Sequence, residues 1–170
     1  MRAIELPVVD SDQRRALLGD DPHPWGGEAE GLEWAEKHHH VGVPAEHGEL
    51  LALAGALIAE VRVDAQPPFP VVGIGSVIVR PDVRGRGLAR LVIEGSLDVA
   101  RRLGPERAML FCREPLVSLY EGFGFLLIDA PVTAEQPAGR VEMPLRAMWA
   151  PLRDGAGWPP GAVEVLGEPF

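Results

Sequence analysis

Alternating arginines and glycines in one short stretch are the residues of this sequence most able to do chemistry. In "VRPDVRGRGLARLV" an apolar run stops at Pro81, residues 84–87 alternate Arg and Gly, and an amphipathic pattern begins at Leu88. Glycines permit positive φ and a close backbone approach, and the first amides of a helix carry a partial positive charge. The stretch predicts an anion site with phosphate as its natural ligand, although a tight turn with solvated arginines would look the same. It contains neither GxxxxGK[ST] nor GxGxxG.

The elements that would position this loop follow from hydrophobic period and turn residues. The predicted helices span 11–19, 88–103 and 114–124, with a short helix after the irregular start of 20–36. The predicted strands span 1–9, two segments of 38–64 joined at 46–49, 71–79, 107–112, 125–132 and 140–149, with a loop at 65–70. Arg90–Glu94 and Asp98–Arg102 have the i,i+4 spacing of ion pairs. This order predicts an α/β (α+β) fold, a mixed, mostly antiparallel sheet flanked by helices, as one domain over 1–170.

The arginine–glycine stretch resembles motif A of the GCN5-related N-acetyltransferases (the GNAT superfamily), whose pattern is Arg/Gln-x-x-Gly-x-Gly/Ala. In that family the loop amides hold the pyrophosphate of acetyl-CoA, and the preceding strand binds the pantetheine through its backbone. The resemblance implies strand contacts from Val77, Ile78 and Val79. It implies phosphate contacts from Arg84, Gly85, Arg86, Gly87, Leu88, Ala89 and Arg90. A GNAT domain that uses acetyl-CoA, without a metal, is therefore expected.

A second signature, "SLYEGFGF" over 118–125, resembles the later GNAT motif in which a helix tyrosine precedes a Gly-Phe pair. That tyrosine commonly protonates the departing thiolate of coenzyme A, so the resemblance makes Tyr120 the candidate general acid. A phenol within hydrogen-bond reach of the sulfur can give up a proton as charge develops there. The alternative is a tyrosine that only packs on the core.

The layout from about His47 to Leu145 is also similar to the aminoglycoside 2′-N-acetyltransferases. Those enzymes carry a glutamate, proposed as the base, at the position of Gly75 in "GIGSV". The resemblance therefore leaves the base open, with the carboxylate of Phe170, Glu114 and Asp129 as candidates. Backbone amides of 77–79 could polarise the acetyl carbonyl.

Composition and charge exclude several other functions. The net charge of −9 disfavours nucleic acid and anionic membranes. Cys112, the single cysteine, lies in the apolar "MLFC" and is expected to be a core thiol. His38 and His40 would share one face of a strand, but no third ligand is near, so no metal is expected. Without an apolar leader region or a run of about 20 apolar residues, a cytoplasmic protein is expected.

The acid-rich segment "GGEAEGLEWAEK" offers an acceptor site, since the family's variable substrate segment lies between its first two strands. Glu33 would form an acidic wall for a cationic amine, and Trp25 and Trp34 would line the pocket. The alternatives are tryptophans in the core and a solvated helix face with a Glu33–Lys37 pair at i,i+4. Lys37 is the only lysine beside fifteen arginines, which we interpret as codon bias.

The leading hypothesis is an acetyl-CoA-dependent N-acetyltransferase that acts on the primary amine of a small, cationic substrate in a ternary complex. A non-catalytic acyl-CoA-binding module, favoured by the missing glutamate, is the first alternative. Acetylation of a protein N-terminus or lysine is the second. A homodimer stays open.

Overall fold

The structure is a computed structural model that describes residues 1–19 and 26–170. Its helices are α1 (Ser11–Leu18), α2 (Leu88–Arg102) and α3 (Val117–Glu121), with the short 3-10 helices η1 (Gly27–Ala29), η2 (Pro81–Val83) and η3 (Glu114–Leu116). Its strands are β1 (Ile4–Leu6), β2 (His39–Pro44), β3 (Leu50–Val63), β4 (Phe69–Val79), β5 (Arg107–Cys112), β6 (Leu126–Leu127), β7 (Val132–Ala134), β8 (Val141–Glu142), β9 (Arg146–Pro151) and β10 (Val163–Val165).

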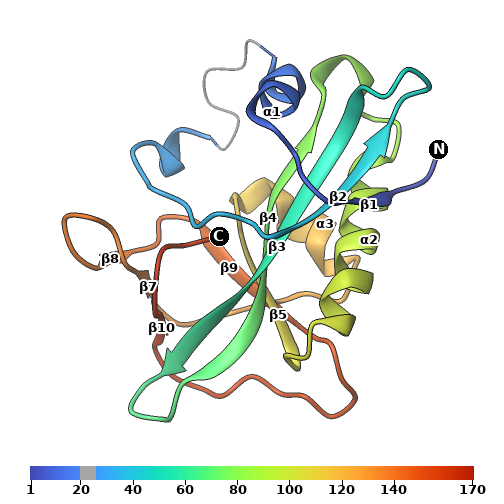
Figure 1. Ribbon diagram of the computed structural model, residues 1–170. Helices are drawn as coiled ribbons and strands as arrows, with labels where there is room; N and C mark the ends of the chain where they lie inside the picture. The colour runs from blue at the N-terminus through green and yellow to red at the C-terminus, as the bar shows by residue number, and fades with distance from the viewer. Residues whose placement is uncertain (20–25) are drawn as a thin grey trace.

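One mixed sheet organises these elements (Figure 1). Its main path runs β6-β9-β5-β4-β3-β10-β7-β8, while β2 pairs with the first half of β3 and β1 pairs with β2. The β4–β5 and β10–β7 pairs are parallel, and the other pairs of described strands are antiparallel. The predicted α/β class, with a mixed and mostly antiparallel sheet flanked by helices, is confirmed.

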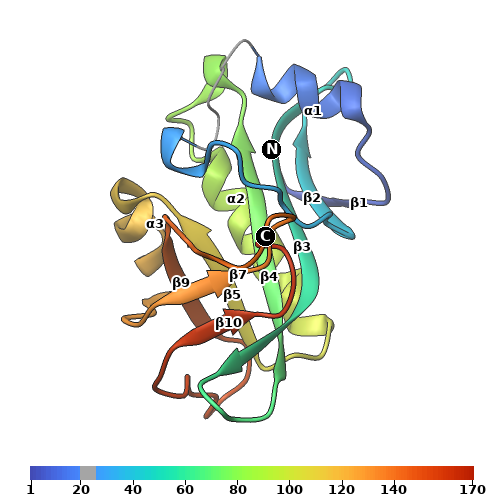
Figure 2. The same cartoon turned by 90° about the vertical axis from the view of Figure 1, so that its left-hand side faces the viewer.

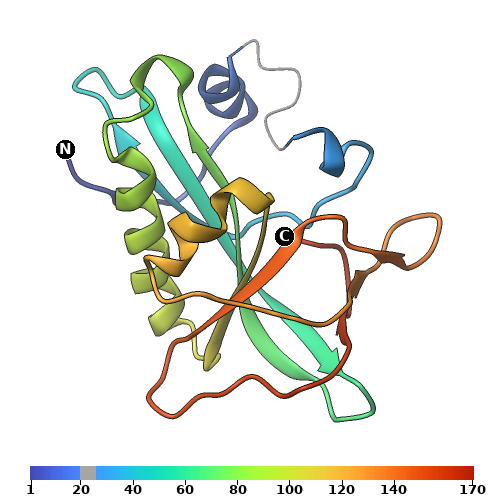
Figure 3. The ribbon, with the colours of Figure 1, turned by 180° about the vertical axis from the view of Figure 1, so that it is seen from behind.

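Alternation along β3 assigns the helices to opposite faces of the sheet, because successive side chains of a strand point in opposite directions. Ala54 and Ala56 pack against side chains of α2 and α3, which lie in front of the sheet in Figure 3. Leu53 packs on the other face against Leu17 of α1, and Leu57 lies on that same face in a cluster with Phe170. The core is therefore divided into two layers by the sheet.

Several predicted strands are shorter or differently placed. Strand 125–132 is divided into β6 and β7, and 140–149 into β8 and β9; Pro131 and Pro144 lie in the breaks and cannot donate to a sheet ladder. The first strand covers only β1. Pro70, predicted in a loop, instead pairs with Glu60 near the start of β4, a position that proline tolerates. Strand β10 was not predicted; three residues of Val-Glu-Val give too short a pattern.

The ion pairs on α2 follow prediction only in part. Arg90 donates to Glu94 at 2.9 Å, as expected. Asp98 instead pairs with Arg101, because Arg102 reaches across to Glu5 on β1. The helix is thereby tied to the edge of the sheet.

Strand β4 changes course at a β-bulge. Ser76 and Val77 together lie opposite the single residue Ala54 of β3, and Ser76 has a φ of +53°. Such a bulge bends its strand and re-aims the backbone. The parallel pairing of β4 with β5 ends at Ile74, so residues 75–79 pair with no described strand on that side. A gap opens between two central strands.

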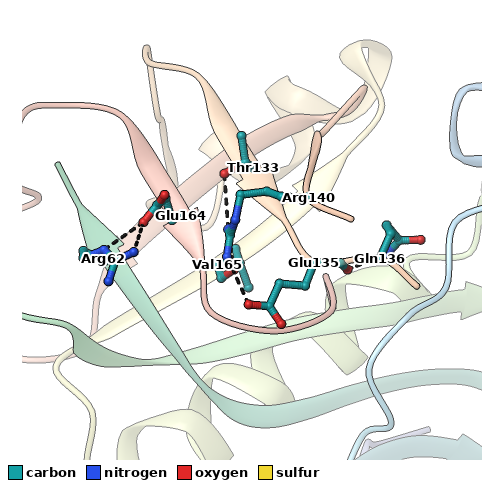
Figure 4. A network of polar contacts seen from close by, with 7 residues as sticks. All are labelled: Arg62, Thr133, Glu135, Gln136, Arg140, Glu164 and Val165. Carbon is teal, nitrogen blue, oxygen red and sulfur yellow. Dashed lines mark hydrogen bonds and ion pairs between the residues drawn. The ribbon is translucent and has the colours of Figure 1, made fainter. Parts of the chain in front are cut away.

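Polar contacts hold the last strand in place (Figure 4). Arg62 donates to Glu164, which joins β3 to β10. Arg140 donates to the backbone carbonyl oxygen of Val165 and to the carboxylate of Glu135. The chain then turns back over the sheet, and its end lies beside the segment that precedes β2 (Figure 2).

Candidate active site

A cavity of about 440 Å³ opens where β4 and β5 part. Side chains from both faces of the sheet line it. Those from the face of α2 and α3 include Cys112, Leu116 and Tyr120, and those from the other face include Trp34, Lys37 and Phe170. Backbone of Gly75, Ser76 and Val77 forms the edge between them. A ligand lying in the gap would therefore be reached from both faces.

The loop before α2 has the geometry of an anion site. Gly85 and Gly87 both have a φ of +77°, and no described side chain or more distant backbone lies within 4 Å of where a Cβ would stand on either. The glycines are thus required by backbone conformation, and they leave the surface open. Gly87 is the N-cap of α2 and no side chain caps this end, so the first amides of the helix face outward.

The arginines around this loop differ in their contacts. Arg84 donates from Nε to the carbonyl oxygen of Val79 at 3.1 Å, which closes the loop onto β4. The Arg90 guanidinium lies 5.5 Å from the ring centroid of Phe123. Arg86 is exposed. Arg84 and Arg90 therefore shape the loop and its helix, while Arg86 projects from its surface.

The other residues predicted to bind acetyl-CoA anchor strand β4 and helix α2 in the core. Val77 lines the cavity, Ile78 is buried in the cluster that contains α1, and Val79 and the buried Leu88 pack in one cluster on the α2 face. Ala89 packs against the core. These side chains fix the position of a backbone whose polar groups face the gap.

Tyr120 reaches the cavity from α3. It is buried, and its ring meets that of Phe125 edge-on with centroids 5.9 Å apart. Burial, with a smaller effect of the neighbouring Cys112, raises the pKa of Tyr120 above its ordinary value. The phenol therefore stays protonated through neutral pH, the state from which an acid must start.

Cys112 is a core thiol, as predicted. It is buried against Met148, with 3.7 Å between the two sulfur atoms, although one side of it borders the cavity. Burial raises the pKa of this thiol to about 11. A thiol that stays protonated is a poor nucleophile.

The segment before β2 departs most from prediction. Residues 32–37 are not helical, since the short helix η1 ends before them, so the expected Glu33–Lys37 pair on a helix face is wrong. Gln136 accepts from the backbone N–H of Glu33 at 2.8 Å and donates to its carbonyl oxygen at 2.9 Å. The N–H of Ala35 donates to the carbonyl oxygen of Pro169 at 2.8 Å. Held extended in this way, the segment turns Lys37 inward, where it is 5% exposed.

The end of the described chain lies against two glycines of β4, Gly73 and Gly75. A Cβ built on Gly73 would lie 2.5 Å from the ring of Phe170, and one built on Gly75 would lie 2.7 Å from its carbonyl carbon. Alternating glycines inside a strand mark a close approach, and this signal was present in "GIG". The structure brings Phe170 into the cavity; a role for its carboxylate stays a prediction.

Of the predicted acceptor residues, Trp34 lines the cavity. Glu33 is exposed and is not in the lining, whereas Glu36 is. Trp25 lies outside the described residues. Arg14 on α1 also lines the cavity, and no sequence signal pointed to it.

The two other acids proposed as bases lie elsewhere. Glu114 forms an ion pair with Arg146 at 3.3 Å. Asp129 lines a separate hollow beside β8 and β9. Neither borders the cavity between β4 and β5.

The histidines do not form a metal site within the part of the chain that the structure describes, which holds no group of three or more His, Cys, Asp or Glu suited to a metal. His40 is buried and its Nε2 accepts from Arg14 at 2.8 Å; burial lowers the pKa of this imidazole. His38 is exposed. No helix among the described residues is long and apolar enough to cross a membrane.

The candidate site thus combines a mixed sheet that splits at a bulge with a glycine-rich turn at a helix start. The model of the acetyltransferase (GNAT) family matches residues 8–125, well over half of the chain. The chain belongs to the GNAT family and is an N-acetyltransferase. The family membership predicted from the 84–89 pattern is thus confirmed; the coenzyme A contacts of these residues and the nearer resemblance to aminoglycoside 2′-N-acetyltransferases stay predictions.

Solved structures show the same fold at low identity. The GNAT family N-acetyltransferase YhbS from Escherichia coli, in complex with CoA, has 19% identity and a TM-score of 0.61 over 99% of this chain and 95% of its own. The ribosomal-protein-S18-alanine N-acetyltransferase from E. coli has 17% identity and a TM-score of 0.54 over 92% and 99%. N-acetylglutamate synthase from Neisseria gonorrhoeae, complexed with coenzyme A and N-acetyl-glutamate, has 16% identity and a TM-score of 0.57 over 90% and 36%. No curated protein gives a significant match.

Proposed function

We propose that residues 1–170 form one catalytic domain that transfers the acetyl group of acetyl-CoA to the primary amine of a small molecule, in a ternary complex. The observation that carries the proposal is the cavity between β4 and β5, bordered by unpaired strand backbone and by Tyr120. The face of α2 and α3, with the 84–90 loop and Tyr120, is the donor side. The opposite face, with Arg14, Trp34, Lys37 and Phe170, is the acceptor side.

On the donor side, the open loop amides at the start of α2 bind the pyrophosphate, and Arg86 adds positive charge at the surface. The pantetheine lies along β4, where the backbone of 75–79 pairs with no described strand on the β5 side and can bind its amides. The thioester then lies in the gap near Tyr120.

The reaction begins when a neutral amine attacks the thioester carbonyl carbon. A C–N bond forms, and the oxyanion is stabilised by backbone N–H groups near the bulge at Ser76, which are fixed before the reaction. The C–S bond then breaks, and Tyr120 gives its proton to the coenzyme A sulfur. The nitrogen loses one proton as the amide forms, which balances the proton that Tyr120 gives.

The dimensions and charge of the cavity favour a small acceptor. A volume of about 440 Å³ must hold the end of the pantetheine as well as the acceptor. Among its described lining residues, Arg14, Lys37 and Arg113 have basic side chains and Glu36 has an acidic one. This lining supports a compact amine with few positive charges better than a polycation such as an aminoglycoside.

Thiol release from acetyl-CoA across a panel of amines tests the proposal. The panel pairs compact primary amines, including amino acids and aralkylamines, with polyamines and an aminoglycoside. We expect release with a member of the first group. Acetyl-CoA binding without release to any amine would instead support the non-catalytic binding module.

A further inference from the structure

Lys37 lies in a trough that two glycines create. Gly55 of β3 and Gly75 of β4 are direct partners across the sheet, and both face the acceptor side. A Cβ built on Gly55 would lie 2.6 Å from Cγ of Lys37, and one built on Gly75 would lie 2.9 Å from its Cε. Any side chain at either position would displace the lysine. The paired glycines therefore leave the space that Lys37 fills.

The amine of Lys37 is held but not neutralised by an acid. Its Nζ donates to the carbonyl oxygen of Ala35 at 2.7 Å, and no salt bridge joins it to a described acid. The pKa of Lys37 is lowered from 10.5 to about 8, chiefly by burial and then by the guanidinium of Arg14 on α1, while Glu168 of the final segment acts in the opposite direction. The lysine thus exchanges its proton near neutral pH.

The other titratable groups near Lys37 do not offset the lowering of its pKa. His40 on β2 is electrostatically coupled to Lys37, and the pKa of this imidazole is lowered by its own burial, so the ring is neutral at pH 7 and above. Glu36, next in the chain, is exposed. Across the gap, Cys112 and Tyr120 have raised pKa values and are uncharged in the same pH range.

Lys37 and Tyr120 approach the gap from opposite faces of the sheet. Both line the cavity, Tyr120 from the donor side and Lys37 from the acceptor side. An acid is needed at the sulfur and a base at the attacking nitrogen, and these atoms lie on opposite sides of the reacting carbon. Lysine can serve as a base when burial lowers its pKa, whereas arginine cannot be deprotonated. The only lysine of the chain is at this place.

We propose that Lys37 is the general base of the reaction and takes the role that an acid has at position 75 in the aminoglycoside enzymes. Neutral Lys37 accepts one proton from the ammonium of the acceptor, which frees the nitrogen lone pair for attack; this proton passes to solvent. The nitrogen loses its second proton as the amide forms. That proton replaces the one that Tyr120 gives to the sulfur, so the products are the acetylamide, the free thiol and one proton. The inference rests on the proposed function.

Direct titration of Lys37 is the first test. Protein labelled with [ε-¹³C]lysine gives a single side-chain signal, because the chain has one lysine. We expect its chemical shift to titrate near pH 8 in the wild type. Titration at the ordinary value of 10.5 would overturn the assignment, whatever the activity of the protein.

The second test compares Lys37→Arg and Lys37→Met on the most active amine of the panel. Arginine keeps the charge and methionine keeps most of the volume, but neither accepts a proton. We expect both to lower kcat/KM at pH 8 by about 100-fold or more, and to lose the rising limb of the pH profile that the wild type shows near pH 8. Both should keep the thermal shift with acetyl-CoA, which verifies folding and the donor side.

Three outcomes separate the inference from the proposed function. If Lys37→Arg keeps the wild-type pH profile, the charge of the side chain is what matters and the base assignment is overturned. If acetyl-CoA produces no thermal shift in the wild type, or no amine releases thiol, the proposed function fails and the base assignment fails with it. If the limb and turnover are lost while the thermal shift stays, both are supported.

Discussion

The donor side of the cavity is built from residues close together in the sequence, whereas the acceptor side is assembled from segments that are far apart in the sequence. Residues 84–90 form a turn and a helix start whose glycine conformations are local. Lys37, in contrast, is placed by Gln136, by Pro169 and by a glycine pair on two strands. A cofactor site formed by local backbone geometry can stay unchanged while the residues on the acceptor side change to bind a different amine. The two sides should therefore respond independently to substitution.

The largest effect is expected on the donor side at Tyr120. Tyr120→Phe keeps the ring that packs on Phe125 and removes only the proton donor. We expect kcat to fall by about 10²–10⁴-fold with acetyl-CoA affinity nearly unchanged. Steady-state thiol release together with calorimetric binding of acetyl-CoA checks this. Unchanged turnover would remove the acid from the mechanism.

Burial of Lys37 should make stability depend on pH on the acceptor side. Below pH 8 the lysine is charged in both folded and unfolded chains, and the cost of its burial is present in full. Between pH 8 and 10.5 the unfolded chain binds more protons, so stability rises with pH and the cost disappears. In urea unfolding, Lys37→Met should have a larger free energy of unfolding than the wild type at pH 7. This difference should shrink by about 3 kcal/mol as the pH rises to 10.5. A difference that stays constant would mean an ordinary lysine pKa.

The contact of Gly75 with the end of the described chain gives a smaller test. A Cβ at this position meets both Phe170 and Lys37, so Gly75→Ala should lower stability by about 1–3 kcal/mol. It should also raise KM for the acceptor and leave acetyl-CoA binding intact. Gly157→Ala is the matched control, since nothing lies within 4 Å of its Cβ position. Equal stability of the two variants would contradict the close approach.

The smallest effect is expected from the contact that holds the segment before β2. Gln136→Ala removes two hydrogen bonds to the backbone of Glu33 and should cost about 1–2 kcal/mol of stability. Because this segment carries Trp34 and Lys37, KM for the acceptor should rise while binding of acetyl-CoA stays the same. Gln66→Ala, at an exposed turn, serves as control. Weakened acetyl-CoA binding in Gln136→Ala would break the separation of the two sides.

The same contrast explains what the sequence could predict. The turn at 84–87, α2 and Tyr120 are contiguous patterns whose geometry is local, and they were predicted. The i,i+4 spacing of Glu33 and Lys37 suggested a helix. The segment is instead held by Gln136, which is 103 residues from Glu33 and could not be anticipated as its partner.

The setting of Lys37 depends on long-range contacts of the same kind. The pairing of Gly55 with Gly75 requires the register of β3 on β4, which the bulge shifts. Two signals were available but incomplete: a lone lysine, and glycines at alternate positions of a strand.

Binding of acetyl-CoA to the loop before α2 tests the central claim most directly. Ligand at 100 times its Kd adds about 2.7 kcal/mol of stability, which a melting curve resolves. We predict a clear thermal shift for the wild type and for Gly155→Glu, and none for Gly87→Glu. The two glycines share a φ of +77° and open surroundings, so the variants differ only in position. A wild type without a shift, or equal shifts in both variants, would contradict the assignment of this loop as the coenzyme A site.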